Sequence, residues 1–320
     1  MAGQVPSQLR DLLDAQSGVF ARWQAIALGI DPEFVQGRLR SGRWQRPQLG
    51  VYAAFSGPVS RDAQLWAAVL RAGPQAVLSH QSAAELEGFA PRPSRLIHVT
   101  VPLAQHMVKV PGIVAHRSGR LELARHPVRT PPRTRIEETA LDLAQLVPTF
   151  DDAFGWISRP CNGRLTTPEL IRTAMQSRGR VRWRRQLDLA LLDIAEGVMS
   201  PLENRWVRDV ERAHRLPGAK RQVLIVRDGQ PQYLDNLYEE LGVGVELDGQ
   251  AFHPVDERWL DISRDNALAA DGILVLRYSW ADVDGRRCAT AAQFAQVAAS
   301  RGWAGSPRRC GPTCSIRPRV

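Results

Sequence analysis

One acidic hairpin constrains the fold of this chain more than any other segment. Residues 233–253 read YLDNLYEELGVGVELDGQAFH: an apolar-rich run, the polar turn EELG, and a second run in which apolar residues alternate. With the turn centred in EELG, Asp235 falls opposite Glu246. Residues two apart on a strand point to the same face, so Asp248 lies beside Glu246. The hairpin is therefore predicted to place three carboxylates on one face and to pack its valines and leucine on the other.

The three carboxylates would repel one another unless a positive charge lies between them. Like charges directly opposite each other on neighbouring strands destabilise a sheet. A hard divalent cation, which takes oxygen ligands, would remove that repulsion. The alternative is an exposed hairpin whose acids are solvated. The convergence of three acids with His253 in a strongly basic chain favours the cation site.

The charge of the chain indicates a polyanionic partner. It has 320 residues and a formal net charge of +9 at pH 7, and only two of its 42 basic residues are lysines. Guanidinium groups pair bidentately with phosphate, so an arginine-rich field suits nucleic acid. A high-GC coding bias would also enrich arginine, but it does not explain the local clusters. The length predicts two or three domains with apolar cores.

The N-terminus and the cysteines are typical of a cytoplasmic protein. The start MAGQVPSQLRDLL lacks the apolar segment of a signal peptide, and no run of about eighteen apolar residues is present. Cys310 and Cys314 lie close together, but no second pair has zinc-site spacing, so no metal knuckle is expected there. The remaining cysteines are Cys161 and Cys288. We expect reduced thiols, no membrane partner and no small-molecule cofactor.

Three short helices followed by a two-stranded wing are predicted for residues 1–56. Leucines at positions 9, 12 and 13 mark an amphipathic helix, and a second short helix ends at a glycine. Asp31 and Pro32 supply the N-cap and the first residue of the third helix. The segment WQRPQLGVYAA then forms the wing. This order predicts a winged helix-turn-helix domain whose third helix enters the major groove of DNA.

The same region resembles a known family of DNA-binding regulators. GVFARWQAIALGIDPEFVQGRLRSGRWQRPQLGVYAAF and the following GPQAVLSHQSAAELEGF are similar to the N-terminal domain of AbiEi-type antitoxins, which belong to type IV toxin–antitoxin systems and bind their own promoters. The resemblance implies a DNA partner and a cognate toxin. It assigns the DNA contacts to one glutamine and four arginines: Gln36, Arg38, Arg40, Arg43 and Arg46. A solvated surface role is the alternative for each, and phosphate contacts alone would not specify bases.

Residues 57–195 are predicted to form a mixed α/β connector. IHVTV and IVAHRS are typical of strands, and PPRTRIEETALDLAQLV of a loop leading into a helix. The histidines of this region show no ligand spacing and are expected to be structural or at the surface: His80, His98, His106 and His116. Residues 171–186 carry six arginines and no acid. A solvated linker and contact with a nucleic-acid backbone are both open for this run.

Residues 196–300 are predicted to form an α/β domain with the acids at a strand edge. SPLENRWVRDVERA begins with a capping serine and a proline, so Glu203 falls in the first turn of a helix, where an acid complements the helix dipole. The strand QVLIV, the hairpin, a helix over WLDISRDNALAADG, the strand ILVLRYSW and a last helix from Thr290 to Ala299 follow. Residues 301–320, with five arginines and no acid, are predicted to be a disordered basic tail.

This order of elements is similar to the very-short-patch-repair (Vsr-like) branch of the PD-(D/E)XK endonucleases. The resemblance runs from SPLE to RYSWADV and is carried by an aspartate, a ten-residue gap, GVELDG and a downstream histidine. It implies that Asp235 and Glu246 bind Mg²⁺. It also implies that Asp248 occupies the catalytic position that is lysine in most of the superfamily.

The resemblance gives four further residues supporting roles. Glu203 and His253 would handle protons or position metal-bound water, and Arg264 and Arg277 would steady the phosphate or brace the acids. The chemistry agrees, because Mg²⁺ neutralises phosphate charge and activates water, and histidine is a suitable base near neutral pH. YLDNLY lacks the arginine that often precedes the aspartate in relatives, so a retained fold without activity is the alternative.

Two function classes follow for an α+β multidomain protein with a winged helix-turn-helix, a mixed α/β connector and a restriction-endonuclease-like α/β domain. The first is a DNA-binding protein whose Mg²⁺-dependent endonuclease-like domain hydrolyses DNA phosphodiesters. The second is an AbiEi-type antitoxin and transcriptional repressor whose nuclease fold is inactive. No feature reads a 2′-hydroxyl, so an RNA substrate is also open.

Overall fold

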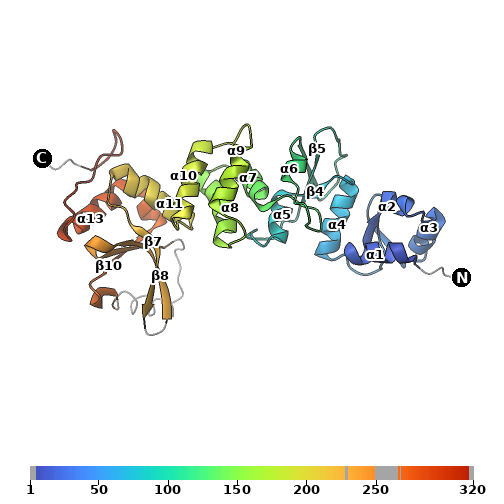
Figure 1. Ribbon diagram of the computed structural model, residues 1–320, viewed down its shortest axis with the longest axis horizontal. Helices are drawn as coiled ribbons and strands as arrows, with labels where there is room; N and C mark the ends of the chain where they lie inside the picture. The colour runs from blue at the N-terminus through green and yellow to red at the C-terminus, as the bar shows by residue number, and fades with distance from the viewer. Residues whose placement is uncertain (1–4, 228–229, 249–265, 267, 317–320) are drawn as a thin grey trace. The chain divides into compact units, whose positions relative to one another are not determined.

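The chain folds into two compact units that combine helices with small sheets (Figure 1). The computed structural model describes residues 5–227, 230–248, 266 and 268–316. Unit 1 is the chain up to Val147 together with Gly163–Thr166 and Thr173–Arg178, and unit 2 is Pro148–Asn162, Thr167–Arg172 and the chain from Gly179 onward. The α+β class is confirmed. Among the described helices, none has both the length and the apolar character needed to cross a membrane.

The first part of unit 1 packs three helices on a three-stranded antiparallel sheet of order β1-β3-β2. Its elements are α1 (Ser7–Ala15), β1 (Val19–Ala21), α2 (Arg22–Ala27), α3 (Pro32–Arg40), β2 (Gln45–Gln48) and β3 (Val51–Ala53). The predicted start of the third helix is confirmed, because Asp31 accepts a hydrogen bond from the backbone N–H of Glu33 at 2.9 Å and α3 begins at Pro32. The strand β1 was not predicted.

Aromatic packing fixes these helices against the sheet. The ring of Trp44 meets the rings of Phe20 and Phe34 edge-on, with centroids 5.4 and 5.6 Å apart. These rings share an apolar core with the buried side chains of Leu9 and Val35. Because Val35 is the buried residue of α3, the polar side chains of that helix point elsewhere.

The rest of unit 1 surrounds a second three-stranded sheet of order β4-β5-β6, in which β5 and β6 are parallel. Its elements are α4 (Arg61–Ala72), β4 (Val77–Leu78), α5 (His80–Leu86), β5 (Ile97–Pro102), β6 (Ile113–Ser118), α6 (Leu121–Ala124) and α7 (Ile136–Leu146). The strands predicted at IHVTV and IVAHRS are confirmed as β5 and β6. The helix α4 buries Trp66 and Leu70 against the first sheet and Leu65 and Val69 against the second.

Unit 2 is built on a mixed four-stranded sheet of order β10-β9-β8-β7. Its elements are α8 (Phe150–Asn162), α9 (Pro168–Gln176, shared between the units), α10 (Arg184–Ala195), α11 (Pro201–Arg205), the π-helix η1 (Trp206–Arg212), β7 (Lys220–Arg227), β8 (Gln230–Tyr238), the 3₁₀ turn η2 (Glu239–Leu241), β9 (Val243–Asp248), β10 (Leu274–Ser279), η3 (Ala281–Gly285) and α13 (Arg287–Ser300). Among the described strands of this sheet, β9 and β10 pair in parallel and the other neighbours pair antiparallel.

The predicted hairpin is present and has the predicted register. The turn η2 ends at Gly242, whose φ of +58° is a left-handed conformation that glycine adopts without strain. Backbone pairing in the hairpin runs from the turn to Asn236 and Val245. One further step along this register places Asp235 opposite Glu246, as the sequence predicted.

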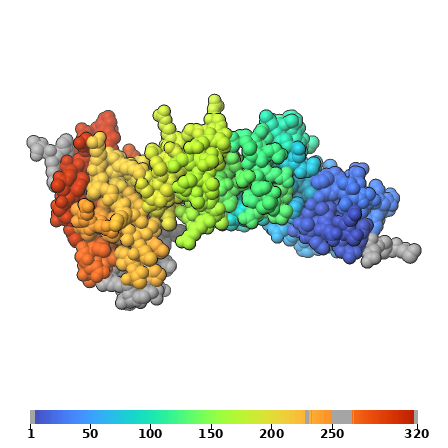
Figure 2. Space-filling model, viewed as in Figure 1, coloured from blue at the N-terminus to red at the C-terminus, as the bar shows by residue number. Residues whose placement is uncertain are grey.

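Helices cover the face of this sheet that is opposite to the acids. Trp206 of η1 stacks on Tyr278 of β10 with centroids 5.0 Å apart and meets Phe294 of α13 edge-on. The red C-terminal residues and the gold residues of α11 and η1 accordingly lie side by side in Figure 2. The segment after α13 differs from the predicted disordered tail, because Cys314 and Ile316 are buried.

Candidate functional site

A row of polar side chains crosses all four strands of the sheet in unit 2. On β7 and β8, Arg221 pairs with Asn236 and Val223 with Leu234, and between these pairs the side-chain amide of Gln222 contacts Asp235. The register of the hairpin places Asp235 opposite Glu246, and the parallel pairing of β9 with β10 places Glu246 opposite Arg277. The row therefore joins two predicted metal ligands to a predicted supporting arginine.

Hydrogen bonds from two neighbouring strands hold the carboxylate of Asp235. It accepts from the backbone N–H of Leu247 at 2.9 Å and from the side-chain amide of Gln222 at 3.1 Å. Burial raises the pKa of the Asp235 carboxyl above its usual value, and the negative charge of Asp248 adds to the increase, while the hydrogen bonds and Arg277 oppose it. Asp235 is thus a fixed and desolvated carboxylate, at the point where backbone pairing of the hairpin ends.

Glu203 reaches the same place from the first turn of α11. The hydroxyl of Ser200 caps the helix by accepting from the Glu203 N–H at 3.2 Å, and the Glu203 carboxylate accepts from the N–H of Met199 at 2.9 Å. The amide of Gln222, which contacts Asp235, lies 3.3 Å from the same carboxylate. Burial raises the pKa of Glu203, and the nearby charge of Asp235 raises it further. Glu203 therefore has a capping role and also belongs to the acid site.

Arg277 supplies the positive charge at the other end of the row. One of its terminal nitrogens lies 3.0 Å from Glu246 Oε2 and the other 3.3 Å from Asp248 Oδ1. Of its two predicted roles, bracing the acids matches these contacts. Two other predicted residues, His253 and Arg264, lie outside the described residues.

Sequence reasoning missed Gln222, the residue that connects Glu203 to Asp235. Its backbone φ is +46°, in the left-handed region, although it lies within a strand. Its position as the first residue of the predicted strand QVLIV was noted, but a single glutamine gives no sequence signal of such a contact. Only the pairing of β7 with β8 reveals its role.

The acids offer the oxygen donors that Mg²⁺ prefers, and Arg277 now holds two of them. Glu203, Asp235, Glu246 and Asp248 offer the carboxylate oxygens that suit a hard cation, but in the described part of the chain no three of them bring ligand atoms within 4.8 Å of one another. Elsewhere in the described chain, two groups of side chains have ligand atoms that all lie within 4.8 Å of one another. They are His80, His98 and His116, and His214, Cys288, Cys310 and Cys314.

The first of these groups brings together three histidines whose spacing in the sequence gave no sign of a cluster. His98 Nδ1 lies 3.0 Å from His116 Nε2, and the rings of His80 and His116 stack with centroids 3.7 Å apart. Burial lowers the pKa of His80 to about 3 and that of His116 to about 4, with contributions from the neighbouring histidines. The register of β5 and β6 and the start of α5 bring these rings together, which sequence spacing does not show.

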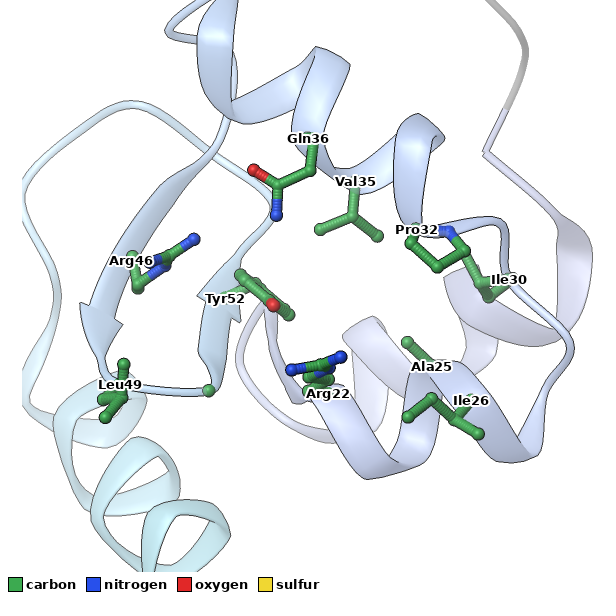
Figure 3. A pocket seen from close by; sticks show the side chains of 11 residues that line it. Arg22, Ala25, Ile26, Ile30, Pro32, Val35, Gln36, Arg46, Leu49 and Tyr52 are labelled. Atoms are coloured by element: carbon green, nitrogen blue, oxygen red, sulfur yellow. The ribbon is translucent and has the colours of Figure 1, made fainter.

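A hollow of about 430 Å³ lies between α2, α3 and the strands β2 and β3 in unit 1. Gln36 of α3 and Arg46 of β2, both predicted DNA contacts, line it together with Arg22 of α2 (Figure 3). The guanidinium of Arg46 lies over the ring of Tyr52, 5.7 Å from its centroid. Arg22, which is exposed, was missed by the sequence analysis because it falls at the start of a short helix.

The other predicted DNA contacts lie outside this hollow. Arg38 lies over the ring of Phe34, 5.1 Å from its centroid. Arg40 forms an exposed ion pair with Glu33 at 3.1 Å, and the side chain of Arg43 is exposed. The structure thus brings together Gln36 and Arg46 but places the remaining three arginines separately.

Within the arginine run of residues 171–186, one member is buried. The Arg178 side chain is 9% exposed and forms ion pairs with Glu138 and, at 2.8 Å, with Asp142. Arg172 pairs with Asp188 at 2.9 Å. Arg178 is therefore neither a solvated linker residue nor available to nucleic acid, because its side chain is paired with two acids of α7.

No family model and no curated protein matches the chain. A function must therefore be argued from the sites themselves.

Proposed function

We propose that this chain is a DNA-binding protein whose C-terminal domain hydrolyses phosphodiesters with Mg²⁺. The observation that carries the proposal is the row Gln222, Asp235, Glu246 and Arg277, with Glu203 added from α11. A single exposed acid needs no explanation. A buried carboxylate, Glu203, and a half-buried one, Asp235, both with raised pKa values and both contacted by one glutamine, cost stability in the absence of a cation, and such sites are typical of function.

The proposed chemistry assigns a part to each described residue. Asp235 and Glu246 would hold Mg²⁺, which neutralises the phosphate and activates water. Glu203, whose pKa is raised, would accept or return a proton through metal-bound water. Gln222 would position Glu203 and Asp235, and Arg277 would exchange its carboxylate partners for a phosphate oxygen. This arrangement is consistent with a domain of the Vsr-like PD-(D/E)XK type.

The first part of unit 1 would bring the domain to DNA. The order α1, β1, α2, α3, β2, β3 is consistent with a winged helix-turn-helix, whose third helix would enter the major groove. Gln36, Arg46 and Arg22 surround one hollow and provide a polar edge with two positive charges. An AbiEi-like N-terminal domain would use this surface on DNA.

Plasmid nicking tests the enzymatic proposal. The full-length protein should relax supercoiled plasmid with Mg²⁺ and not with EDTA, and Asp235→Asn and Glu246→Gln should each lower the rate at least about a hundred-fold. Glu239→Gln is the matched control, since it removes a carboxylate from the turn of the same hairpin without touching the row. Equal rates for all four proteins would refute the proposal, and a parallel assay with RNA would identify that substrate.

The second candidate is an AbiEi-type antitoxin and repressor with an inactive nuclease fold. The contacts of Arg277 with Glu246 and Asp248 favour it, because they already neutralise acids that a metal would need. On this proposal the protein binds DNA from upstream of its own gene in a gel-shift assay. Asp235→Asn should change neither this DNA binding nor the binding of a cognate toxin. An Asp235→Asn variant that no longer nicks plasmid but still binds the upstream DNA would separate the two functions.

A further inference from the structure

Three cysteines and one histidine from distant parts of the chain meet in unit 2. His214 follows η1, Cys288 is the second residue of α13, and Cys310 and Cys314 belong to the segment after α13. Their sulfur and imidazole nitrogen atoms all lie within 4.8 Å of one another. The sequence analysis expected no metal knuckle at Cys310 and Cys314, because it looked for a second pair nearby in the sequence.

The spacing of the sulfurs matches a shared metal better than a covalent bond. Cys288 Sγ and Cys310 Sγ are 3.6 Å apart. A disulfide would bring them to about 2.05 Å. Two thiolates bound to one tetrahedral Zn²⁺, each at about 2.3 Å, lie roughly 3.8 Å apart. The observed distance is close to the second value.

The imidazole of His214 is an independent observation that points to a ligand. The residue is fully buried, and its Nδ1 lies 2.9 Å from the carbonyl oxygen of Val210. A carbonyl only accepts, so Nδ1 carries the proton and Nε2 presents a lone pair. Among the described residues, Nε2 has no hydrogen-bond partner. A backbone carbonyl on one ring nitrogen and a metal on the other is the usual arrangement of a zinc-binding histidine.

The position of the cluster explains why the last segment is folded. Cys314 and Ile316 are buried, and the backbone N–H of Arg308 donates to the carbonyl of His214 at 2.8 Å. This segment has few other apolar side chains with which to form a core. A metal ion joining it to η1 and to the start of α13 would supply the missing stabilisation.

We propose that His214, Cys288, Cys310 and Cys314 bind one Zn²⁺ ion and that this ion fastens the C-terminal segment to unit 2. Four protein ligands fill a tetrahedral shell and leave no position for water or substrate. The site is therefore structural, and it is separate in ligands and in chemistry from the oxygen-rich acid row. The proposal holds whether or not the acid row cleaves DNA.

Metal analysis of the full-length protein tests this. Protein purified without chelator from zinc-supplemented cells should contain about one Zn²⁺ per chain, and Co²⁺ substitution should give the strong visible absorption of a tetrahedral thiolate site. Cys310→Ser, at an exposed ligand, should lower zinc affinity by more than about ten-fold. Cys161→Ser is the control, because Cys161 lies outside the cluster, and it should keep the full zinc content.

Each contrary result is decisive. Wild-type protein that lacks zinc while its thiols all react with a thiol reagent overturns the proposal. So does a Cys288–Cys310 disulfide found by peptide mass analysis. Zinc content and affinity in Cys310→Ser equal to those of the wild type would also overturn it. If Cys310→Ser does not fold, limited proteolysis of the wild-type protein replaces it: a chelator should expose cleavage after α13, and added Zn²⁺ should restore protection.

Discussion

The side-chain amide of Gln222 donates to the carboxylate of Asp235 at 3.1 Å, and through this contact two strands and the start of α11 share one acid site. Both carboxyls that Gln222 contacts have pKa values raised by burial. A site of this kind is costly to the fold when empty and becomes favourable when a cation enters. Stability and metal binding should therefore be linked at Asp235.

Asp235→Asn should stabilise unit 2 in EDTA at pH 7. The pKa of Asp235 lies above its usual 3.8 in the folded protein, so the folded state keeps a proton that the unfolded chain releases, and stability falls as the pH rises through the folded pKa. Asparagine removes that cost. The gain in urea midpoint should be present at pH 7 and shrink as the pH falls toward 3.8. A lower midpoint for the variant at pH 7 would show that burial does not dominate this site.

Arg277→Met should make Mg²⁺ more stabilising than it is for the wild type. In the present arrangement Arg277 supplies the positive charge for Glu246 and Asp248, so its loss lowers stability in EDTA and frees oxygen donors for a cation. The change in melting temperature on adding Mg²⁺ should exceed that of the wild type, at roughly 2–4 °C for each kcal/mol. Arg286→Met, which removes an exposed partner of Asp282, is the control. Identical Mg²⁺ responses would mean that Arg277 and the ion do not compete.

The parts of the fold that sequence predicted are those governed by local chemistry. Asp31 and Pro32 begin α3 because a cap and a fixed φ act within one turn. The hairpin register follows from the alternation of Val243 and Val245 and from the length of the turn. Asp235, Glu246 and Asp248 were found on this basis.

The parts that sequence missed depend on pairing between distant segments. Gln222 faces Asp235 only through the pairing of β7 with β8. His214 and Cys288 join the two C-terminal cysteines only after η1 and α13 pack on each other. Ligand spacing along the chain identifies compact knuckles, and a site assembled from three segments has no such spacing.

Arg178→Met should lower the free energy of unfolding of unit 1 by about 3 kcal/mol, because it removes the ion pair of the partly buried Asp142 and leaves the buried Glu138 with its pair to Arg120. Chemical denaturation followed by tryptophan fluorescence measures the loss. Arg180→Met removes an exposed arginine of the same run and should change stability by less than about 0.5 kcal/mol. Equal effects of the two substitutions would mean that the ion pairs of Arg178 contribute little.

Arg46→Ala and Arg22→Ala should each weaken binding to double-stranded DNA. Each should also reduce the slope of log binding constant against log salt concentration by about one, because one phosphate contact is lost. Both arginines line the hollow beside Gln36, where a phosphate backbone would neutralise them. Arg95→Ala, an exposed arginine of unit 1 outside the hollow, is the matched control and should leave the slope unchanged. Fluorescence anisotropy at several salt concentrations measures the slope. An unchanged slope in all three variants would place the DNA surface elsewhere.

The three-histidine cluster should make unit 1 lose stability in mild acid. The pKa of His80 is about 3 in the folded protein against a usual value of 6.5, so between these values the unfolded chain binds a proton that the folded state does not. This contribution is fully present above pH 6.5 and is lost as the pH falls, by about 2 kcal/mol at pH 5 for His80 alone. His80→Asn, which tolerates the left-handed backbone at φ +49°, should flatten the curve of unfolding free energy between pH 7 and 5. His106→Asn, at an exposed histidine outside the cluster, should keep the slope of the wild type. Parallel curves for the wild type and His80→Asn would show that His80 is protonated as readily in the folded protein as in the unfolded chain.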